Sequence, residues 1–266
     1  MDVNEQQLLQ RIKTEYLRIL GDKLAGIYVH GSLAFGCYRR EVSDIDFLVT
    51  LNAPLLQTEK EQMISALLAL DEQAPPKGFE MSAVLCSVCA PFRYPTPYEL
   101  HYSNAYRQRY TDDLAGTCRD LNGCDADLAA HITVTRQVGI ALYGPPPCEM
   151  FAPVPKECYL DAIWQDICDA QEGIRRDPVY YVLNLCRVLA YVQDGAVLSK
   201  EQGGEWGMGH LKEDQNLIAA ALECYRGQPP KHTMDGLEKY AQKVTGLIRQ
   251  NSVFLSACNK NIDRQP

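Results

Sequence analysis

A proline-dense stretch near the middle of the chain constrains the fold most. Gly144-Pro-Pro-Pro147 is followed closely by Pro153-Val-Pro155, and this many prolines cannot continue a helix or a central strand. Apolar runs of strand length occur only before this stretch, whereas every long segment after it shows helical spacing. We therefore predict an α+β fold, with an α/β domain at residues 1–155 and an all-α domain at residues 156–266.

Hydrophobic periodicity predicts the order of elements in each half. The first half corresponds to a small mixed sheet covered by helices. The helices expected there are Glu5–Leu20, Thr58–Leu70 and Asp127–Leu142, and the expected strands are Leu24–Val29, Ser43–Thr50 and Glu80–Val88. The helices expected in the second half are Tyr159–Ile174, Val179–Gln193, Gln215–Tyr225 and Met234–Leu255.

Composition and charge exclude several classes of protein. The 266 residues are 46% hydrophobic, which is enough to bury a core without disulfides or structural metals. The 34 acidic residues outnumber the 26 basic ones, and an acidic chain with no Lys/Arg cluster binds long nucleic acids poorly. A small polyanion such as a nucleotide stays compatible, because a metal ion can supply the missing positive charge.

The chain shows no signal for a membrane or for export. No apolar run approaches the roughly 18 residues that span a bilayer, and the charged N-terminal segment lacks the apolar region of a signal peptide. We expect a cytoplasmic monomer with no membrane or nucleic-acid partner.

The cysteines predict reduced thiols. Their number, 11, is odd, and they are scattered along a chain that is not short. Cys86 and Cys89 have the spacing of a redox or zinc motif, but they lie in the expected strand Glu80–Val88 and its end, where positions three apart point to opposite faces. We interpret them as buried structural thiols.

Paired carboxylates carry the strongest chemical signal. Asp44 and Asp46 open an apolar strand, where residues two apart share one face. Two carboxylates on one face repel each other unless a cation lies with them, and oxygen ligands suit Mg²⁺. The Gly31-Ser32 turn ends the preceding strand, and its backbone N–H groups and hydroxyl could hold a phosphate. A phosphate site facing a paired-carboxylate metal site is what phosphoryl or nucleotidyl transfer needs.

Glu80 supplies a third acid near the start of the third expected strand. If this strand pairs beside the second, Glu80 reaches the Asp pair. It would then share a metal or accept the proton of an attacking hydroxyl, and the residues alone leave both roles open.

At these positions the chain resembles the nucleotidyltransferase superfamily. The resemblance rests on Val29-His-Gly-Ser-Leu-Ala-Phe-Gly36 and Ser43-Asp-Ile-Asp-Phe-Leu-Val49. Segments further along resemble the aminoglycoside adenylyltransferases of the 3″/9 type: Phe92-Arg-Tyr-Pro95 with Glu99-Leu100, Asp113-Leu-Ala-Gly116, Asp127-Leu-Ala129, Leu142-Tyr-Gly-Pro145, Phe151-Ala-Pro-Val-Pro155, Leu183-Asn-Leu-Cys-Arg187 and Ser199-Lys200.

This resemblance implies a nucleotidyltransferase-fold domain followed by a helical domain that completes a cleft for ATP and drug. Members transfer AMP from Mg-ATP to a hydroxyl of an aminocyclitol or aminoglycoside antibiotic and release pyrophosphate. By resemblance, Asp44 and Asp46 would hold two Mg²⁺ ions, with Glu80 as catalytic base and further metal ligand. The nucleotide would be bound by Gly31, Ser32, Arg187, Lys200 and Tyr225.

The residues of the second half also have plain structural interpretations. Arg187 lies in an otherwise apolar helix, where an unpaired charge is costly, so an ion pair with a nearby acid is the alternative to a phosphate contact. Lys200 alone is typical of a solvated surface, and Tyr225 alone is typical of a core. Asp177 matches a drug-binding Asp of the family, and it also fits a helix N-cap followed by Pro178.

Two departures from the family bear on the acceptor. Members that accept both streptomycin and spectinomycin carry a Trp where this chain has Ala105, and an Asp where it has Gly173. Loss of a stacking aromatic and of a charge partner weakens a large, multiply charged drug most, so we favour spectinomycin and its 9-hydroxyl. The alternatives are another acceptor, namely streptomycin, another drug or a protein side chain, or a non-catalytic, antitoxin-like nucleotide-binding module. The three acids and the full second half argue against the module.

Overall fold

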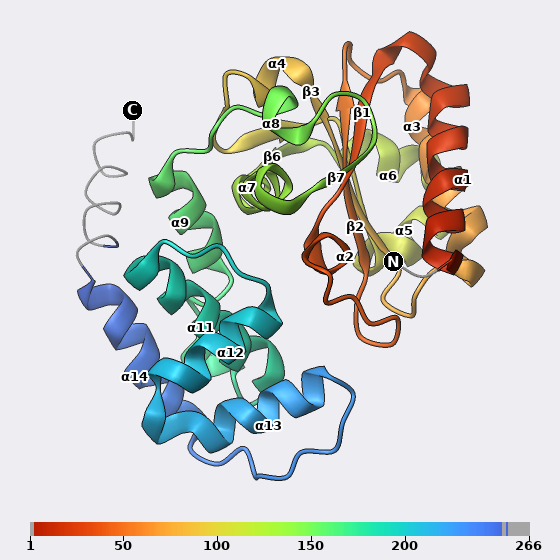
Figure 1. Ribbon diagram of the computed structural model, residues 1–266. Helices are drawn as coiled ribbons and strands as arrows, with labels where there is room; N and C mark the ends of the chain where they lie inside the picture. The colour runs from red at the N-terminus through yellow and green to blue at the C-terminus, as the bar shows by residue number, and fades with distance from the viewer. Residues whose placement is uncertain (1–2, 252–253, 255–266) are drawn as a thin grey trace. The chain divides into compact units, whose positions relative to one another are not determined.

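The computed structural model describes residues 3–251 and 254. The chain forms two compact units, Met1–Val154 and Pro155–Pro266 (Figure 1). Within the described residues, no helix combines the length and the apolarity needed to cross a membrane.

The first unit is built on a mixed five-stranded sheet with the order β5-β3-β2-β1-β7. Its strands are β1 (Leu24–Val29), β2 (Ile45–Leu51), β3 (Phe79–Leu85), β5 (Leu100–Ser103) and β7 (Ile140–Tyr143). Strands β2 and β3 are parallel, while the other neighbouring pairs are antiparallel. The parallel pair requires a crossover, and α3 (Gln57–Leu70) provides it. The mixed sheet expected from the sequence is confirmed.

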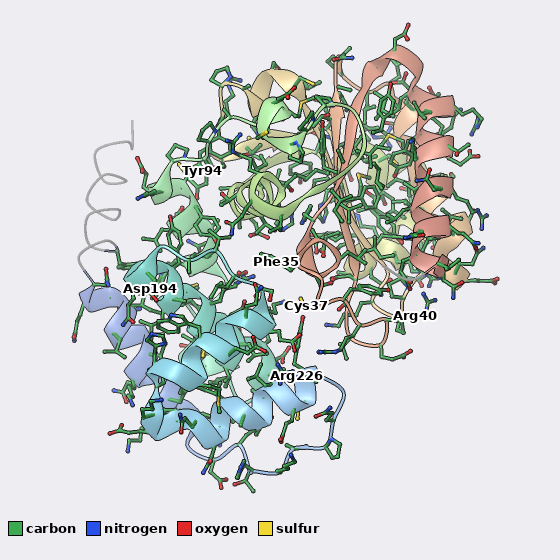
Figure 2. All side chains as sticks on the ribbon, viewed as in Figure 1. Phe35, Cys37, Arg40, Tyr94, Asp194 and Arg226 are labelled. Atoms are coloured by element: carbon green, nitrogen blue, oxygen red, sulfur yellow. The ribbon has the colours of Figure 1, made fainter. Side chains whose placement is uncertain are left out.

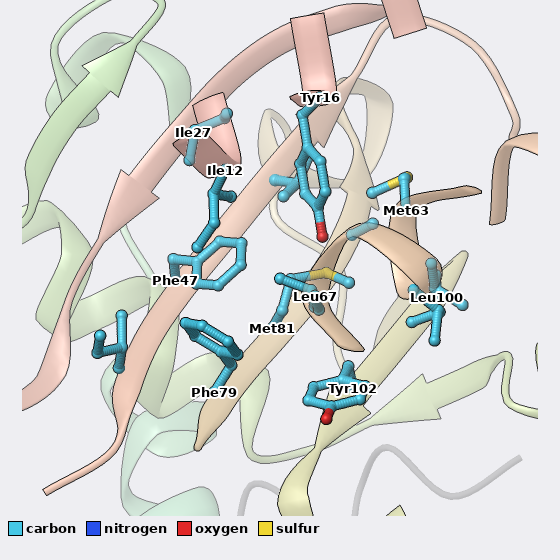
Figure 3. Packing of buried hydrophobic residues seen from close by; sticks show 14 of the residues in the cluster. Ile12, Tyr16, Ile27, Phe47, Met63, Leu67, Phe79, Met81, Leu100 and Tyr102 are labelled. Atoms are coloured by element: carbon cyan, nitrogen blue, oxygen red, sulfur yellow. The ribbon is translucent and has the colours of Figure 1, made fainter. Parts of the chain in front are cut away.

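One face of the sheet is covered by α1 (Val3–Leu20) and α3. Ile12 and Tyr16 of α1 and Met63 of α3 pack with Phe47 and Met81 of the central strands (Figure 3). All five side chains are fully buried or nearly so. Packing therefore fixes which residues of β2 face α1 and α3.

The opposite face of the sheet is covered in part by α7 (Leu128–Val138). Leu128 and Ile132 of this helix cluster with Leu48 of β2 and Val84 of β3, and all four are fully buried. Because both faces are covered, every residue of β2 after Asp46 is buried, and all of them except Thr50 are apolar.

Shorter elements complete this unit. They are α2 (Gly31–Phe35), α4 (Cys86–Cys89), β4 (Thr96–Tyr98), α5 (Arg107–Asp112), α6 (Leu114–Asp120), β6 (Gly123–Asp125) and α8 (Pro147–Met150), with β4 and β6 paired in a separate small sheet.

Two secondary-structure predictions in the first unit were wrong. Cys86–Cys89 forms the short helix α4 and does not continue the strand. The Cys89 Sγ–H donates to the Leu85 carbonyl, and burial raises the pKa of this thiol to about 12, so the interpretation as a buried structural thiol holds for Cys89. Cys86 is only half-buried, so the prediction of a buried thiol was wrong there. The expected helix Asp127–Leu142 ends at Val138, and Ile140–Tyr143 pairs with β1 as an edge strand. This long-range pairing decides between two structures that the local apolar pattern allows equally.

The described part of the second unit consists of helices and their connections. They are α9 (Lys156–Gln165), α10 (Ala170–Gly173), α11 (Pro178–Asp194), α12 (Lys200–His210), α13 (Gln215–Tyr225) and α14 (Leu237–Gln250). The central helix α11 contacts α12, α13 and α14, which explains why its sequence is apolar nearly all round.

Three helix predictions in the second unit needed correction. The expected helix Tyr159–Ile174 is interrupted between α9 and α10. The expected helix Met234–Leu255 begins at Leu237, and part of its predicted C-terminal end lies outside the described residues. Helix α12 was not expected, because its several glycines lower helix propensity.

Glycines bring α12 close to α11 and α13. A Cβ atom at Gly204 would lie 2.6 Å from Leu222 Cδ2, and one at Gly207 would lie 2.5 Å from Cys186 Sγ. Close packing therefore requires glycine at these positions, although glycine lowers the helix propensity of α12.

We expect Gly207→Ala to destabilise the protein by about 1–3 kcal/mol through overpacking, despite a helix-propensity gain of about 1 kcal/mol. The matched control is Gly209→Ala in the same helix, where a Cβ has no neighbour within 4 Å; it should be neutral or stabilising. Urea denaturation of the three proteins measures the difference. Equal stabilisation by both substitutions would show that close helix contact does not explain the glycine at position 207.

Candidate active site

Three carboxylates meet where β2 and β3 begin. Asp44 precedes β2, Asp46 is its second residue, and the parallel register places Asp46 opposite Glu80 of β3. One oxygen from each of Asp44, Asp46 and Glu80 lies within 4.8 Å of the others, and all three residues are half-buried. The expectation that Glu80 reaches the Asp pair is confirmed. Like charges this close favour a cation, and three carboxylate oxygens suit a hard divalent metal.

The chain turns sharply beside this cluster at Gly31. The His30 backbone N–H donates to the Asp46 carbonyl at 3.0 Å, and Gly31 adopts φ +58°. A Cβ at Gly31 would overlap the Asp46 carboxylate, so only glycine allows the backbone to approach that close. The expected Gly-Ser turn is the start of the short helix α2.

The hydroxyl of Ser32 stands out within this helix. Its Oγ is buried and has no hydrogen-bond partner among the described residues. A buried hydroxyl of this kind normally has a partner, so this geometry is compatible with a ligand contact.

His131 is a residue of this site that sequence reasoning missed. Leu128 and Ile132 pack α7 against the sheet, and the helical period turns His131 toward the carboxylates. The His131 Nε2 atom lies 3.1 Å from Asp127 Oδ2 and 3.9 Å from Glu80 Oε1. The Asp-x-x-x-His spacing of Asp127 and His131 on a predicted helix was the signal that could have identified it.

The charges around His131 determine its protonation. Burial alone would lower the pKa of His131, but Asp127, with smaller contributions from Glu80 and Asp46, raises it to about 10. The ring of His30 lies 4.8 Å away, and burial together with the His131 charge holds the pKa of His30 well below its usual range. His131 is therefore the charged member of the pair at neutral pH.

The second unit carries the other predicted residues. Arg187 lies on α11, Lys200 is the first residue of α12, and Tyr225 is the last residue of α13; all three are half-buried. Lys200 begins its helix because Ser199 and Gln202 form a capping box. Tyr225 is thus not a core residue.

Arg187 forms an ion pair, which was the predicted structural alternative to a phosphate contact. Its Nη2 lies 2.8 Å from Asp166 Oδ2. The Lys200 Nζ lies 5.0 Å from the centre of the Tyr180 ring. Asp177 caps α11 by accepting from the Tyr180 N–H at 3.1 Å, so the predicted N-cap is confirmed, and the exposed Asp177 keeps its second predicted role open.

An ion-pair network anchors the end of α13. Arg226, labelled in Figure 2, follows Tyr225, and its Nε donates to Glu201 Oε1 at 2.5 Å. A second nitrogen of Arg226 donates to Glu205 at 2.6 Å. This contact holds the end of α13 against α12 next to Lys200.

The two positions predicted to bear on the acceptor have distinct surroundings. Ala105 is exposed, and the ring of the adjacent Tyr106 lies 5.8 Å from that of His101. Gly173 is buried, and a Cβ there would overlap the Tyr181 hydroxyl. That hydroxyl donates to Asp169 at 2.9 Å, so Tyr181 occupies the space that a side chain at position 173 would need.

Comparison with known proteins gives a domain match in each half of the chain. Residues 7–76 match the nucleotidyltransferase domain, and residues 149–250 match the C-terminal domain of aminoglycoside adenylyltransferase. An aminoglycoside (3″) (9) adenylyltransferase of Klebsiella pneumoniae is 27% identical, with 91% of this chain and 97% of that protein covered. A spectinomycin 9-adenylyltransferase of Staphylococcus aureus is also 27% identical, with 90% of this chain and 91% of that protein covered.

A solved structure shares the fold. A spectinomycin adenylyltransferase from Enterococcus faecalis, crystallised with ATP and spectinomycin, superposes with a TM-score of 0.76 at 18% identity, covering 92% of this chain and 99% of that one. The fold and the domain match of residues 7–76 indicate a nucleotidyltransferase. Within that class, the named relatives and the match of residues 149–250 indicate an aminoglycoside adenylyltransferase.

We expect His131→Gln to lower the free energy of unfolding by about 1–3 kcal/mol at pH 6 and by progressively less up to pH 10. The pKa of His131 is raised to about 10 in the folded state against about 6.5 when unfolded. The stabilisation is therefore complete below pH 6.5 and is lost as the pH rises through 10. Urea denaturation in EDTA at several pH values measures it.

The control is His101→Gln, another half-buried histidine of the same unit, whose pKa is lowered chiefly by burial. Its effect should not shrink as the pH rises. A pH-independent cost of His131→Gln would contradict a charged His131.

Proposed function

We propose that the protein transfers AMP from Mg-ATP to the 9-hydroxyl of spectinomycin, releases pyrophosphate, and so confers resistance. The observation that carries the proposal is the cluster of Asp44, Asp46 and Glu80 at the adjacent starts of two parallel strands. Its support from comparison is the match of residues 7–76 to the nucleotidyltransferase domain and of residues 149–250 to the C-terminal domain of aminoglycoside adenylyltransferase.

The carboxylates are proposed to hold magnesium. Asp44 and Asp46, with Glu80 as a further ligand, offer oxygens close enough together for shared coordination, and we propose two ions. Bound Mg²⁺ would supply neutralising charge at the transferred phosphorus.

Glu80 is proposed as the general base. It would accept the proton of the drug hydroxyl while that oxygen forms its bond to the α-phosphorus of ATP and the bond to pyrophosphate breaks. The charged His131, 3.9 Å from the Glu80 carboxylate, favours the ionised form of Glu80 that this role requires.

The remaining residues are proposed to bind the two substrates. The buried Ser32 hydroxyl would donate to a phosphate oxygen beside Gly31. Arg187 and Lys200 would bind the triphosphate as cations, and Tyr225 would line the nucleotide site. Asp177 is exposed at the start of α11 and would bind a cationic group of the drug.

The choice of spectinomycin over streptomycin rests on what two positions lack. Ala105 cannot stack against a drug ring, and Gly173 offers no carboxylate. A larger drug with more positive charge loses more binding free energy from these two absences than a smaller one does.

We expect purified protein with Mg-ATP to release pyrophosphate when spectinomycin is added, and to release little with streptomycin or without an acceptor. Release with both drugs would support the family reaction and contradict the specificity. If neither drug supports release while ATP still binds, the acceptor is another molecule or the protein is a non-catalytic nucleotide-binding module.

We expect Glu80→Gln to reduce turnover by about 100-fold or more, the usual contribution of a general base, while Mg-ATP still binds. The matched control is Glu99→Gln, a half-buried glutamate of the same unit, which accepts from the Leu55 N–H at 3.2 Å. Steady-state kinetics and calorimetry measure the two effects. Near-normal turnover of the Glu80 variant would remove Glu80 from the role of base.

A further inference from the structure

Four side chains of the second unit form one connected network. Asp166 follows α9, Tyr180 and Arg187 lie on α11, and Lys200 begins α12. Both oxygens of the Asp166 carboxylate are engaged: Oδ1 accepts from the Tyr180 hydroxyl at 3.1 Å, and Oδ2 accepts from Arg187 Nη2 at 2.8 Å. The Lys200 ammonium lies over the face of the Tyr180 ring, 5.0 Å from the ring centre.

This network joins both cations that the proposed function assigns to the triphosphate. Two members, Asp166 and Tyr180, have no part in that assignment. Nothing in the sequence had singled out either one, since Asp166 lies within an expected helix and Tyr180 was one aromatic residue of an apolar run.

The geometry allows the network to orient the two cations as well as to stabilise the unit. The Arg187 and Asp166 side chains are 18% and 23% exposed, so the pair contributes to stability and is still reached by solvent. Long cationic side chains lose much rotamer freedom when they bind a ligand. A carboxylate and a ring that hold them beforehand remove part of that cost.

We propose that Asp166 and Tyr180 are positioning residues, which hold Arg187 and Lys200 in the arrangement that binds the polyphosphate of a nucleotide. Asp166 orients the guanidinium directly. Tyr180 fixes the Asp166 carboxylate through its hydroxyl and Lys200 through its ring. This inference rests on the phosphate-binding part of the proposed function, and it does not depend on which acceptor is used.

The test is calorimetric titration of the full-length protein and its variants with Mg-ATP, in the absence of any drug. Asp166→Asn removes the charge and keeps the shape. Tyr180→Phe removes only the hydroxyl, and Tyr180→Leu also removes the ring under Lys200. Asp214→Asn is the control, because Asp214 makes a comparable ion pair with Lys243 at 2.9 Å elsewhere in the same unit.

We expect Asp166→Asn and Tyr180→Leu to raise the Kd for Mg-ATP about threefold to tenfold, the factor associated with ordering one long side chain. Tyr180→Phe should raise it less than Tyr180→Leu does, because the ring remains. Where an acceptor is turned over, the KM for ATP should rise in the same order, with kcat and the KM for the drug within about twofold of the parent.

Three results would overturn the inference. One is an unchanged Kd in Asp166→Asn, and another is an equal rise in Asp214→Asn, which would reveal a general loss of structure. The third is a parent protein that does not bind Mg-ATP, which would also end the proposed function. A parent that binds Mg-ATP but transfers AMP to no acceptor would overturn the proposed function alone, and the order of the Kd values would still decide the inference.

Discussion

The parallel pairing of β2 with β3 is the constraint on which the site depends. It places Asp46 directly opposite Glu80, although the two residues are far apart in the sequence. A register shift of one residue would turn one of these carboxylates toward the α1 and α3 side of the sheet. Packing prevents that shift, because Phe47 and Met81 are buried on that side while Leu48 and Val84 are buried on the other. Burial of these apolar side chains thus holds the carboxylates close together although they repel one another.

The neighbourhood of the carboxylates offsets part of this repulsion. His131 brings one positive charge close to Glu80, and Asp127 holds that charge in place. One imidazolium cannot balance four carboxylates, so the local charge stays negative. A divalent cation is the simplest complement to such a site. With the charge of such a cation, an acidic chain could bind a nucleotide without a basic cluster.

The sequence was sufficient to predict several features that depend on local pattern and near neighbours. It predicted the sheet followed by helices, the closeness of Asp44 and Asp46, and the cap made by Asp177. It failed where a distant contact decides: the edge pairing of Ile140–Tyr143 with β1 and the glycine-rich α12, whose helical form depends on packing against α11. His131 was missed for the same reason, because the sequence does not show that the helix carrying it packs beside Glu80 on the sheet.

Arg187 shows how a sequence argument can be sound and still incomplete. The cost of a charge in an apolar helix correctly implied a partner, and the structure supplies Asp166. A partner on the same unit does not by itself exclude the arginine from phosphate binding, because a guanidinium carries five donors and can contact more than one acceptor.

The surroundings of Gly173 are fixed by the packing of the second unit. In this chain the Tyr181 hydroxyl fills the space beside Gly173 and binds Asp169, and Tyr181 itself is nearly buried on α11. An aspartate could enter position 173 only if Tyr181 moved, and Tyr181 is held by α11, the helix that also carries Arg187. The absence of a carboxylate at position 173 is therefore built into the packing of the unit. An aspartate at position 173 would require a coordinated replacement at position 181, because a single substitution would meet the Tyr181 hydroxyl first.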